Sequence, residues 1–228
     1  MTAEALFAAH ESETAGERAY RRIKSDIQFG RLAPGQKLKL EGLRETYDAS
    51  VGTLRELLSR LCSEGMVLAE GFRGFEVSPV SREDLKEIAA LRQLLESHAI
   101  EISFKSGNVE WEAHVVAAHH KLSSMELRMK AKAGDRSETE QWKRYDGEFH
   151  QALISACGSR FLMTTHASVF DKYLRYQILA MSNRGDISIR EHRTLLDCAL
   201  KRDAKSACKT LATHIEGGVK SALAAGVI

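Results

Sequence analysis

The sequence predicts a mainly α-helical protein with two domains, a small one that ends in a β-hairpin and a larger one built from helices alone. The chain has 228 residues, which is enough for two modest domains. Its only prolines are Pro34 and Pro79. Because proline interrupts helices, the proline-free stretch 80–228 favours an all-α region, and Pro79 indicates a domain boundary near residues 78–82.

The first domain, residues 16–78, is predicted from consecutive local patterns. The segment "GERAYRRIKSDIQFGRL" is amphipathic and contains Gly30, a residue type common at helix ends. A Pro-Gly turn and a strand-like segment in "APGQKLKL" lead to two short helices, "LEGLRETYD" and "ASVGTLRELLSRLCSEG". "MVLAEGFRGFEVSPV" alternates apolar and polar residues around Gly71–Gly74, which indicates a two-stranded hairpin. This order is typical of a winged helix-turn-helix, and we expect residues 1–15 before it to be a flexible segment.

The second domain, residues 79–228, is predicted to be an all-α helical bundle. Apolar residues recur there with the period of a helix that buries one face. The first stripe of this kind consists of Leu85, Ile88, Leu91, Leu95, Ala99 and Ile102. A turn near Lys201–Ala204, with Asp203 as the N-cap, should fold the last two helices into an antiparallel hairpin.

This hairpin leads to a candidate metal site. His192 precedes the turn by about 10 residues and His214 follows it by about 11, so both imidazoles should lie about 15–17 Å from the turn, at one level. On another helix, "RYDGEFHQAL" places Asp146 and His150 four residues apart on one face. One carboxylate and three imidazoles suit Zn²⁺, Ni²⁺ or a similar transition metal. The alternative is that Asp146 and His150 form an ordinary polar surface pair.

The winged helix-turn-helix predicts contacts with double-stranded DNA. The helix that begins near Ser50 would lie in the major groove with its first residues at the bases, and the hairpin tip would approach the minor groove. Ser50 is the expected N-cap, where a phosphate can also bind. The candidate DNA-binding residues are Arg44, Ser50, Val51, Gly52, Thr53, Arg55, Arg73 and Gly74. For Arg55, the alternative is a surface ion pair with Glu56 or Glu45.

Composition narrows the class of protein further. The formal net charge of +2 excludes a uniformly basic coat but allows a local basic surface. The four cysteines include no C-x-x-C pair and are expected to be reduced thiols. No apolar run reaches the length of a transmembrane helix, and the acidic start of the chain lacks a signal-peptide pattern. We therefore expect a cytoplasmic protein with no membrane partner.

Several motifs within residues 19–67 belong together: I-x-x-G-x-L, PG-x-x-L, V-x-x-L-R-E-x-L and EG-M-V. In this order they resemble the DNA-binding domain of the GntR superfamily of regulators. That family usually carries an arginine at the position of Val51 and a proline at that of Thr53, with Gly52 between them here. The departure implies a base preference different from the family's common half-site. A second arginine that nearly all members of the family carry is retained here as Arg55.

The second domain carries a resemblance of its own. "LRQLLES" at 91–97, D-x-x-x-H at 146–150, "EH" at 191–192 and the histidine at 214 are similar in order and spacing to the FCD effector domain. This domain defines the FadR-type branch of the GntR regulators. The resemblance implies the metal ligands Asp146, His150, His192 and His214. It also implies a small carboxylate effector, for which Arg92 and Arg175 are the candidate anion contacts. An ordinary pair, such as Arg92 with Glu96, is the alternative.

Within the branch, "KLKLEGLRETY", "VGTLRELL" and "VEWEAHV" look most similar to the carbon-starvation-induced (CsiR) regulators, which respond to glutarate. The resemblance implies a repressor of a catabolic operon that is released by a carboxylate at the metal. One recognition helix reads too few bases for a useful specificity ratio, so we expect a homodimer on a short inverted repeat. Two alternatives stay open: a metal-dependent hydrolytic enzyme that uses the Asp/His cluster, and a DNA-binding protein whose metal is purely structural.

Overall fold

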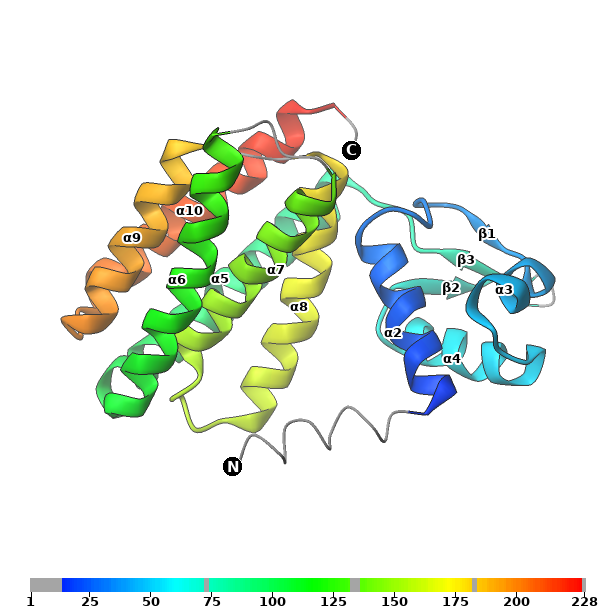
Figure 1. Cartoon of the computed structure of the whole chain (residues 1–228), viewed down its shortest axis with the longest axis horizontal. Coiled ribbons are helices and arrows are strands. Elements are labelled where there is room, and N and C mark those ends of the chain that lie inside the picture. The colour runs from blue at the N-terminus through cyan, green and yellow to red at the C-terminus, as the bar shows by residue number, and fades with distance from the viewer. Residues whose placement is uncertain (1–13, 72–73, 132–135, 182–183, 227–228) are drawn as a thin grey trace. The chain divides into compact units, whose positions relative to one another are not determined.

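The computed structural model describes residues 14–71, 74–131, 136–181 and 184–226 (Figure 1). The chain divides into an N-terminal unit, Met1–Pro79, and a helical unit, Val80–Ile228. Most of the segment predicted to be flexible, residues 1–15, lies outside the described residues, and so does Arg73.

The N-terminal unit is a winged helix-turn-helix. Its elements in order are α2 (Ala15–Gln28), β1 (Lys37–Leu38), α3 (Leu40–Tyr47), α4 (Val51–Ser63), β2 (Val67–Ala69) and β3 (Phe75–Val77). The strand-like segment of the sequence, β1, joins the hairpin as a third antiparallel strand, so that the order across the sheet is β1-β3-β2. The wing is therefore the β2–β3 hairpin, in which Val67 lies opposite Val77.

The core of this unit holds α4 in place. Ile23 and Ile27 of α2 belong to one apolar cluster with Leu54, Leu58 and Leu61 of α4, and all five side chains have no exposed surface. Their spacing of three or four residues gives each helix one buried stripe. The opposite face of α4 is left for solvent or DNA.

The helical unit consists of six described helices. They are α5 (Arg82–Ser106), α6 (Val109–Ala131), α7 (Arg136–Ile154), α8 (Arg160–Leu179), α9 (Asp186–Leu200) and α10 (Ala204–Ala224). Helix α6 packs against α7 and α9, while α5 packs against α7, α8 and α10. None of the described helices is long and apolar enough to cross a lipid bilayer.

The last two helices form the predicted hairpin. Helix α9 ends at Leu200, α10 begins at Ala204, and the Asp203 side chain accepts a hydrogen bond from the Ser206 amide as the N-cap of α10. Arg202 in this turn has a φ of 58°, the left-handed conformation that reverses the chain. The hairpin sets the levels of His192 and His214.

The apolar stripe predicted for α5 is wrong at its centre. Leu85 and Ala99 of α5 are fully buried, but Leu91 is 43% exposed. At that level α5 instead buries Arg92 and Glu96, which are 0% and 1% exposed. The Arg92 Nε donates to Glu96 Oε1 at 2.9 Å, and this pairing offsets part of the cost of removing both charges from water.

The buried pair predicts an unequal outcome for two arginine substitutions. Arg92→Met leaves the Glu96 carboxylate buried without its cation and should lower the free energy of unfolding by about 3–5 kcal/mol. Arg193→Met is the matched control, because Arg193 also pairs with an acid four residues on, Asp197, but with side chains 68% and 48% exposed. It should cost at most about 1 kcal/mol. Urea unfolding of the two variants with a chelator present measures both, and equal small losses would contradict the prediction.

Candidate metal centre

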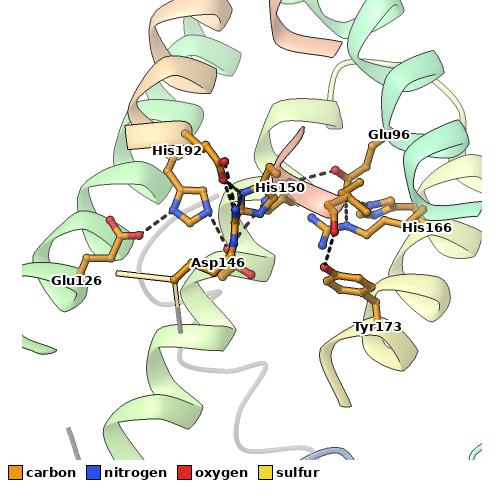
Figure 2. Close-up of polar contacts among 12 residues, drawn as sticks. Glu96, Glu126, Asp146, His150, His166, Tyr173 and His192 are labelled. Atoms are coloured by element: carbon orange, nitrogen blue, oxygen red, sulfur yellow. Dashed lines mark hydrogen bonds and ion pairs between the residues drawn. The ribbon is translucent and has the colours of Figure 1, made fainter. Parts of the chain in front are cut away.

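Three helices bring the four predicted ligand residues together. Helix α7 supplies Asp146 and His150, and α9 supplies His192 (Figure 2). Helix α10 supplies His214. All four side chains are buried, and one ligand atom from each lies within 4.8 Å of the others. The surface-pair alternative for Asp146 and His150 is therefore wrong, since these two side chains are 5% and 1% exposed.

The α9–α10 hairpin accounts for much of this geometry. The rings of His192 and His214 have centroids 4.8 Å apart, as expected for residues at one level of the hairpin. The ring of His150 lies 5.2 Å from that of His214. The spacing of i and i+4 on α7 then places Asp146 beside His150 on the same side of the helix.

A glutamate lies behind each of the three imidazoles. The pairs are His150 Nδ1 with Glu96 Oε2 at 3.0 Å, His192 Nδ1 with Glu126 Oε1 at 2.7 Å, and His214 Nδ1 with Glu191 Oε2 at 2.8 Å. A carboxylate can only accept a hydrogen bond from such a ring, so this arrangement puts the hydrogen of His150 and His192 on Nδ1. Their lone pair is then on Nε2, the tautomer that metal-binding histidines adopt when a carboxylate orients them. At His214 the Nη2 of Arg184, which can only donate, lies 3.0 Å from the same Nδ1, so Arg184 and Glu191 both contact that atom.

The inner ring nitrogens fit a metal ion. Among the described residues, neither His150 Nε2 nor His192 Nε2 has a hydrogen-bond partner, although both are buried. His192 Nε2 lies 3.1 Å from Asp146 Oδ1, but the two atoms are not aligned for a hydrogen bond. A buried polar atom without a partner costs about 1–3 kcal/mol, which a shared cation would remove. Three imidazoles and a carboxylate are a donor set that suits Zn²⁺ or Ni²⁺.

Burial and charge give the imidazoles different pKa values. Burial lowers the pKa of His150, and it lowers the pKa of His214 to about 3, so both rings are neutral and able to bind a cation. For His192, burial acts in the same direction but the carboxylates of Asp146 and Glu126 outweigh it, raising the pKa to about 9. A metal ion at this ring must therefore displace a proton.

A cavity opens beside the four residues. Its volume is about 320 Å³ including the part open to solvent, and its walls include Trp142, Lys143, Tyr173, Gln177 and Arg184 as well as three of the four ligand residues. Gly218 of α10 also lines it, and a Cβ there would lie 2.1 Å from the Tyr173 hydroxyl. Because Gly218 has no side chain, α8 comes close enough for Gln177 to donate to its carbonyl at 3.3 Å.

The two arginines predicted to contact an effector do not line this cavity in the described part of the chain. The guanidinium of Arg92 is stacked 4.4 Å from the Phe170 ring centroid and 4.6 Å from that of Tyr173, and its terminal nitrogens have no hydrogen-bond partner there. Arg175, on α8, is 4% exposed, and burial lowers its pKa. Their role as effector contacts stays a prediction.

Residues that the sequence reasoning did not assign complete the site. Glu191 was visible only as the neighbour of His192, and Arg184 pairs with it through both terminal nitrogens. Glu126 carries no local signal, because its partner lies 66 residues away on α9. Lys143 could have been found from its position one helical turn before Asp146.

The candidate DNA-binding residues lie around the start of α4. Ser50 is the N-cap, accepting from the Thr53 amide at 3.1 Å, and Val51 and Gly52 begin the first turn. Arg55 is exposed, and within the described residues it forms no ion pair with Glu45 or Glu56. Two further candidates lie outside α4: the exposed Arg44, which is 3.6 Å from Glu41, and Gly74, which has a φ of 106° at the wing.

A winged helix-turn-helix joined to a helical unit with a buried Asp/His cluster defines a DNA-binding regulator with a sensing domain. Comparison with known families agrees. Residues 15–77 match the gntR family of bacterial regulatory proteins, and residues 87–217 match the FCD domain. The chain belongs to the GntR family, in its FadR-type branch with an FCD domain, and it is a transcription regulator rather than an enzyme.

Individual relatives support this assignment. Over 205 residues, 89% of this chain and 83% of the relative, the sequence is 38% identical to the HTH-type transcriptional regulator BphR of Paraburkholderia xenovorans. It is 32% identical to the HTH-type transcriptional repressor GlaR of Escherichia coli, over 86% of this chain and 90% of that protein. The structure of E. coli McbR/YncC has the same fold, with a TM-score of 0.77 and 19% identity over 93% of this chain and 98% of that one.

Proposed function

We propose that this regulator is a homodimeric repressor whose hold on its operator is released when a small carboxylate binds at a metal ion in the helical unit. The observation that carries the proposal is the buried Asp146, His150, His192 and His214 cluster, in which a glutamate orients each imidazole. Regulation by repression is supported by the relative GlaR, which is named a repressor. The metal-binding role rests on the donor set.

The ligand residues are suited to one dication, Zn²⁺ or Ni²⁺. Asp146 would supply one oxygen, and His150, His192 and His214 would each supply Nε2. When bound, the ion would supply the positive charge that draws a carboxylate into the cavity. Four protein donors would leave one position for it on a five-coordinate ion and two on a six-coordinate one. Glu96, Glu126 and Glu191 would hold the rings in place and raise their basicity.

The DNA-binding role is proposed for α4 and the wing. The first turn of α4, from Ser50 to Thr53, would face the bases, and Arg55 would reach a phosphate or a guanine edge. One such helix reads too few bases for a useful specificity ratio, so we propose a homodimer on an inverted repeat. Because Val51, Gly52 and Thr53 replace the family's usual residues, the half-site should differ from the common one.

The effector is proposed to be a small carboxylate of about the size of glutarate. The regulated genes are proposed to form a catabolic operon, and the regulator itself is proposed to act in the cytoplasm. This rests on the resemblance of three sequence segments to the glutarate-responsive regulators. The alternative is a purely structural metal, in which case no carboxylate would change DNA binding.

The metal proposal predicts graded losses of affinity. His192→Ala removes a ligand and should abolish measurable Zn²⁺ binding, whereas Glu126→Gln keeps the ligand and weakens its orientation, for a loss of about 10–100-fold. Competition with a chromogenic chelator measures both. Glu148→Gln on the exposed side of α7, where Glu148 pairs with Lys121, is the control and should bind normally. Purified protein that contains no transition metal and takes none up on titration would dispose of the site.

For DNA binding, the informative change is Arg55→Ala. If Arg55 reads a base or holds a phosphate, operator affinity should fall by about 1–3 kcal/mol, that is, roughly 5–150-fold. A gel-shift titration at fixed salt, with the DNA upstream of the gene that encodes this protein as the probe, measures the affinity. Arg193→Ala, an exposed arginine of the helical unit, should leave the affinity unchanged. An unchanged affinity for Arg55→Ala would remove this residue from the interface.

The repressor proposal is tested by coupling between the two units. A carboxylate that binds the metal-loaded protein should raise its melting temperature and weaken operator binding about 5–150-fold in the same concentration range, because an effector shifts the protein only by its differential affinity for two states. Chelation should abolish both effects. Thermal-shift and gel-shift titrations with C3–C6 carboxylates decide the matter. Hits that persist after chelation, or hits that never release DNA, would favour the structural-metal alternative.

A further inference from the structure

Lys143 is a buried cation in the wall of the metal cavity. It lies on α7, is 7% exposed and lines the same cavity as Asp146, His192 and His214. Among the described residues its ammonium group has no hydrogen-bond acceptor and no carboxylate within 4.0 Å. Its Nζ instead lies over an aromatic face, the Trp142 ring, whose centroid is 4.2 Å away.

The other cations around the cluster differ from Lys143 in this respect. Arg92 donates to Glu96, and Arg184 donates to both oxygens of Glu191. Burial lowers the pKa of Lys143, and the charges of Arg92 and Arg184 act in the same direction, although Asp146 and Glu126 oppose the shift. A cation in a mostly buried side chain is costly without a counter-ion, and a contact with an aromatic ring recovers only part of that cost. The Lys143 ammonium would therefore gain free energy from an anion in the cavity.

A second polar group in the same wall also lacks a partner. The Trp142 side chain lines the cavity and is 3% exposed, and its indole Nε1 is buried without an acceptor in the described part of the chain. Buried indole N–H groups usually find one. Two adjacent residues of α7 therefore carry donors, one charged and one neutral, without a hydrogen-bond acceptor among the described residues, and a small rotation of the indole would be needed to bring its N–H to a ligand.

The charges around the cluster also favour an anion beside Lys143. The carboxylates are those of Glu96, Glu126, Asp146 and Glu191, and the cations are Arg92, Lys143 and Arg184. Once a metal has displaced the proton of His192, the imidazoles are neutral and these side chains carry one net negative charge, which the dication changes to one net positive charge. An effector with a single carboxylate on the metal would balance that charge but would leave the Lys143 ammonium without a contact.

We infer that Lys143 and Trp142 form a subsite for a second acidic group, so that the effector is a dicarboxylate held by the metal at one end and by these two donors at the other. The inference rests on the proposed metal-anchored effector. It assigns the second contact to Lys143 in place of Arg92 and Arg175, which lie outside the walls of the cavity. Lys143 then selects diacids over monoacids of equal length, because only a diacid pairs the buried ammonium.

The test compares two series of acids on Zn²⁺-loaded full-length protein by isothermal titration calorimetry. The diacids malonate, succinate, glutarate and adipate are each matched with the monoacid of the same carbon number, propanoate to hexanoate. At least one diacid should bind at least about 10-fold more tightly than its monoacid, as expected for one charge-assisted hydrogen bond. Lys143→Met, an uncharged side chain of similar length, should remove that preference and leave monoacid and Zn²⁺ affinity unchanged.

Trp142→Phe keeps the aromatic ring and removes only the N–H, so it should lower diacid affinity by a smaller factor and leave monoacid affinity unchanged. It also serves as the second variant if Lys143→Met folds poorly. Lys121→Met, at an exposed lysine of α6, is the control. Because Lys143 has no hydrogen-bond or ion-pair partner among the described residues, and Met can also pack on the Trp142 ring, Lys143→Met should leave the melting temperature of the ligand-free protein unchanged or raised, whereas a structural lysine would lower it.

The outcomes separate this inference from the proposed function. If acids bind but wild type shows no preference for diacids, or Lys143→Met retains the preference, the subsite is wrong while the metal-anchored carboxylate stands. If no acid of either series binds the Zn²⁺-loaded wild type, the carboxylate effector itself is wrong and the subsite falls with it.

Discussion

The helical unit is organised by one demand of physical chemistry: a buried imidazole N–H must have an acceptor. Three glutamates meet this demand, but a buried carboxylate in turn needs donors. Glu96 therefore also accepts from Arg92 and His166, and Glu191 also accepts from Arg184. These polar groups thus form a series of hydrogen bonds that runs from the arginines through the glutamates to the imidazoles. The series ends at the Nε2 atoms of His150 and His192, which have no partner among the described residues and which a cation would satisfy.

This network connects the helices more widely than the apolar core alone would require. Helices α5, α6 and α9 supply the glutamates, α7, α9 and α10 supply the inner ring, and α8 adds His166 through its bond to Glu96 (Figure 2). A ligand that changes the position of one imidazole therefore acts on a glutamate of another helix. Binding energy gained at the centre is available to bias the arrangement of the whole unit, which is what a sensing domain requires.

The sequence was sufficient where the signal is local or periodic. The winged helix-turn-helix, the Asp203 cap and the levels of His192 and His214 all follow from turn chemistry and helix geometry. It was misleading where tertiary packing decides. Leu91 fits an apolar stripe, yet α5 buries Arg92 instead, because the guanidinium pairs with Glu96 of the same helix and stacks on Phe170 and Tyr173 of α8. Glu126 could not be found, since nothing near it in the sequence marks its bond to an imidazole three helices later.

The turn between α9 and α10 has a further consequence for how this chain can change over evolutionary time. His192 and His214 meet because equal lengths of helix separate them from Asp203. Inserting or deleting one residue on either arm would rotate the ring on that arm by about 100° and move it about 1.5 Å along the axis, away from the centre. Point substitutions on the outer faces of these helices should therefore accumulate freely, whereas gaps in an alignment of relatives that retain the cluster should fall outside the stretch between the two histidines.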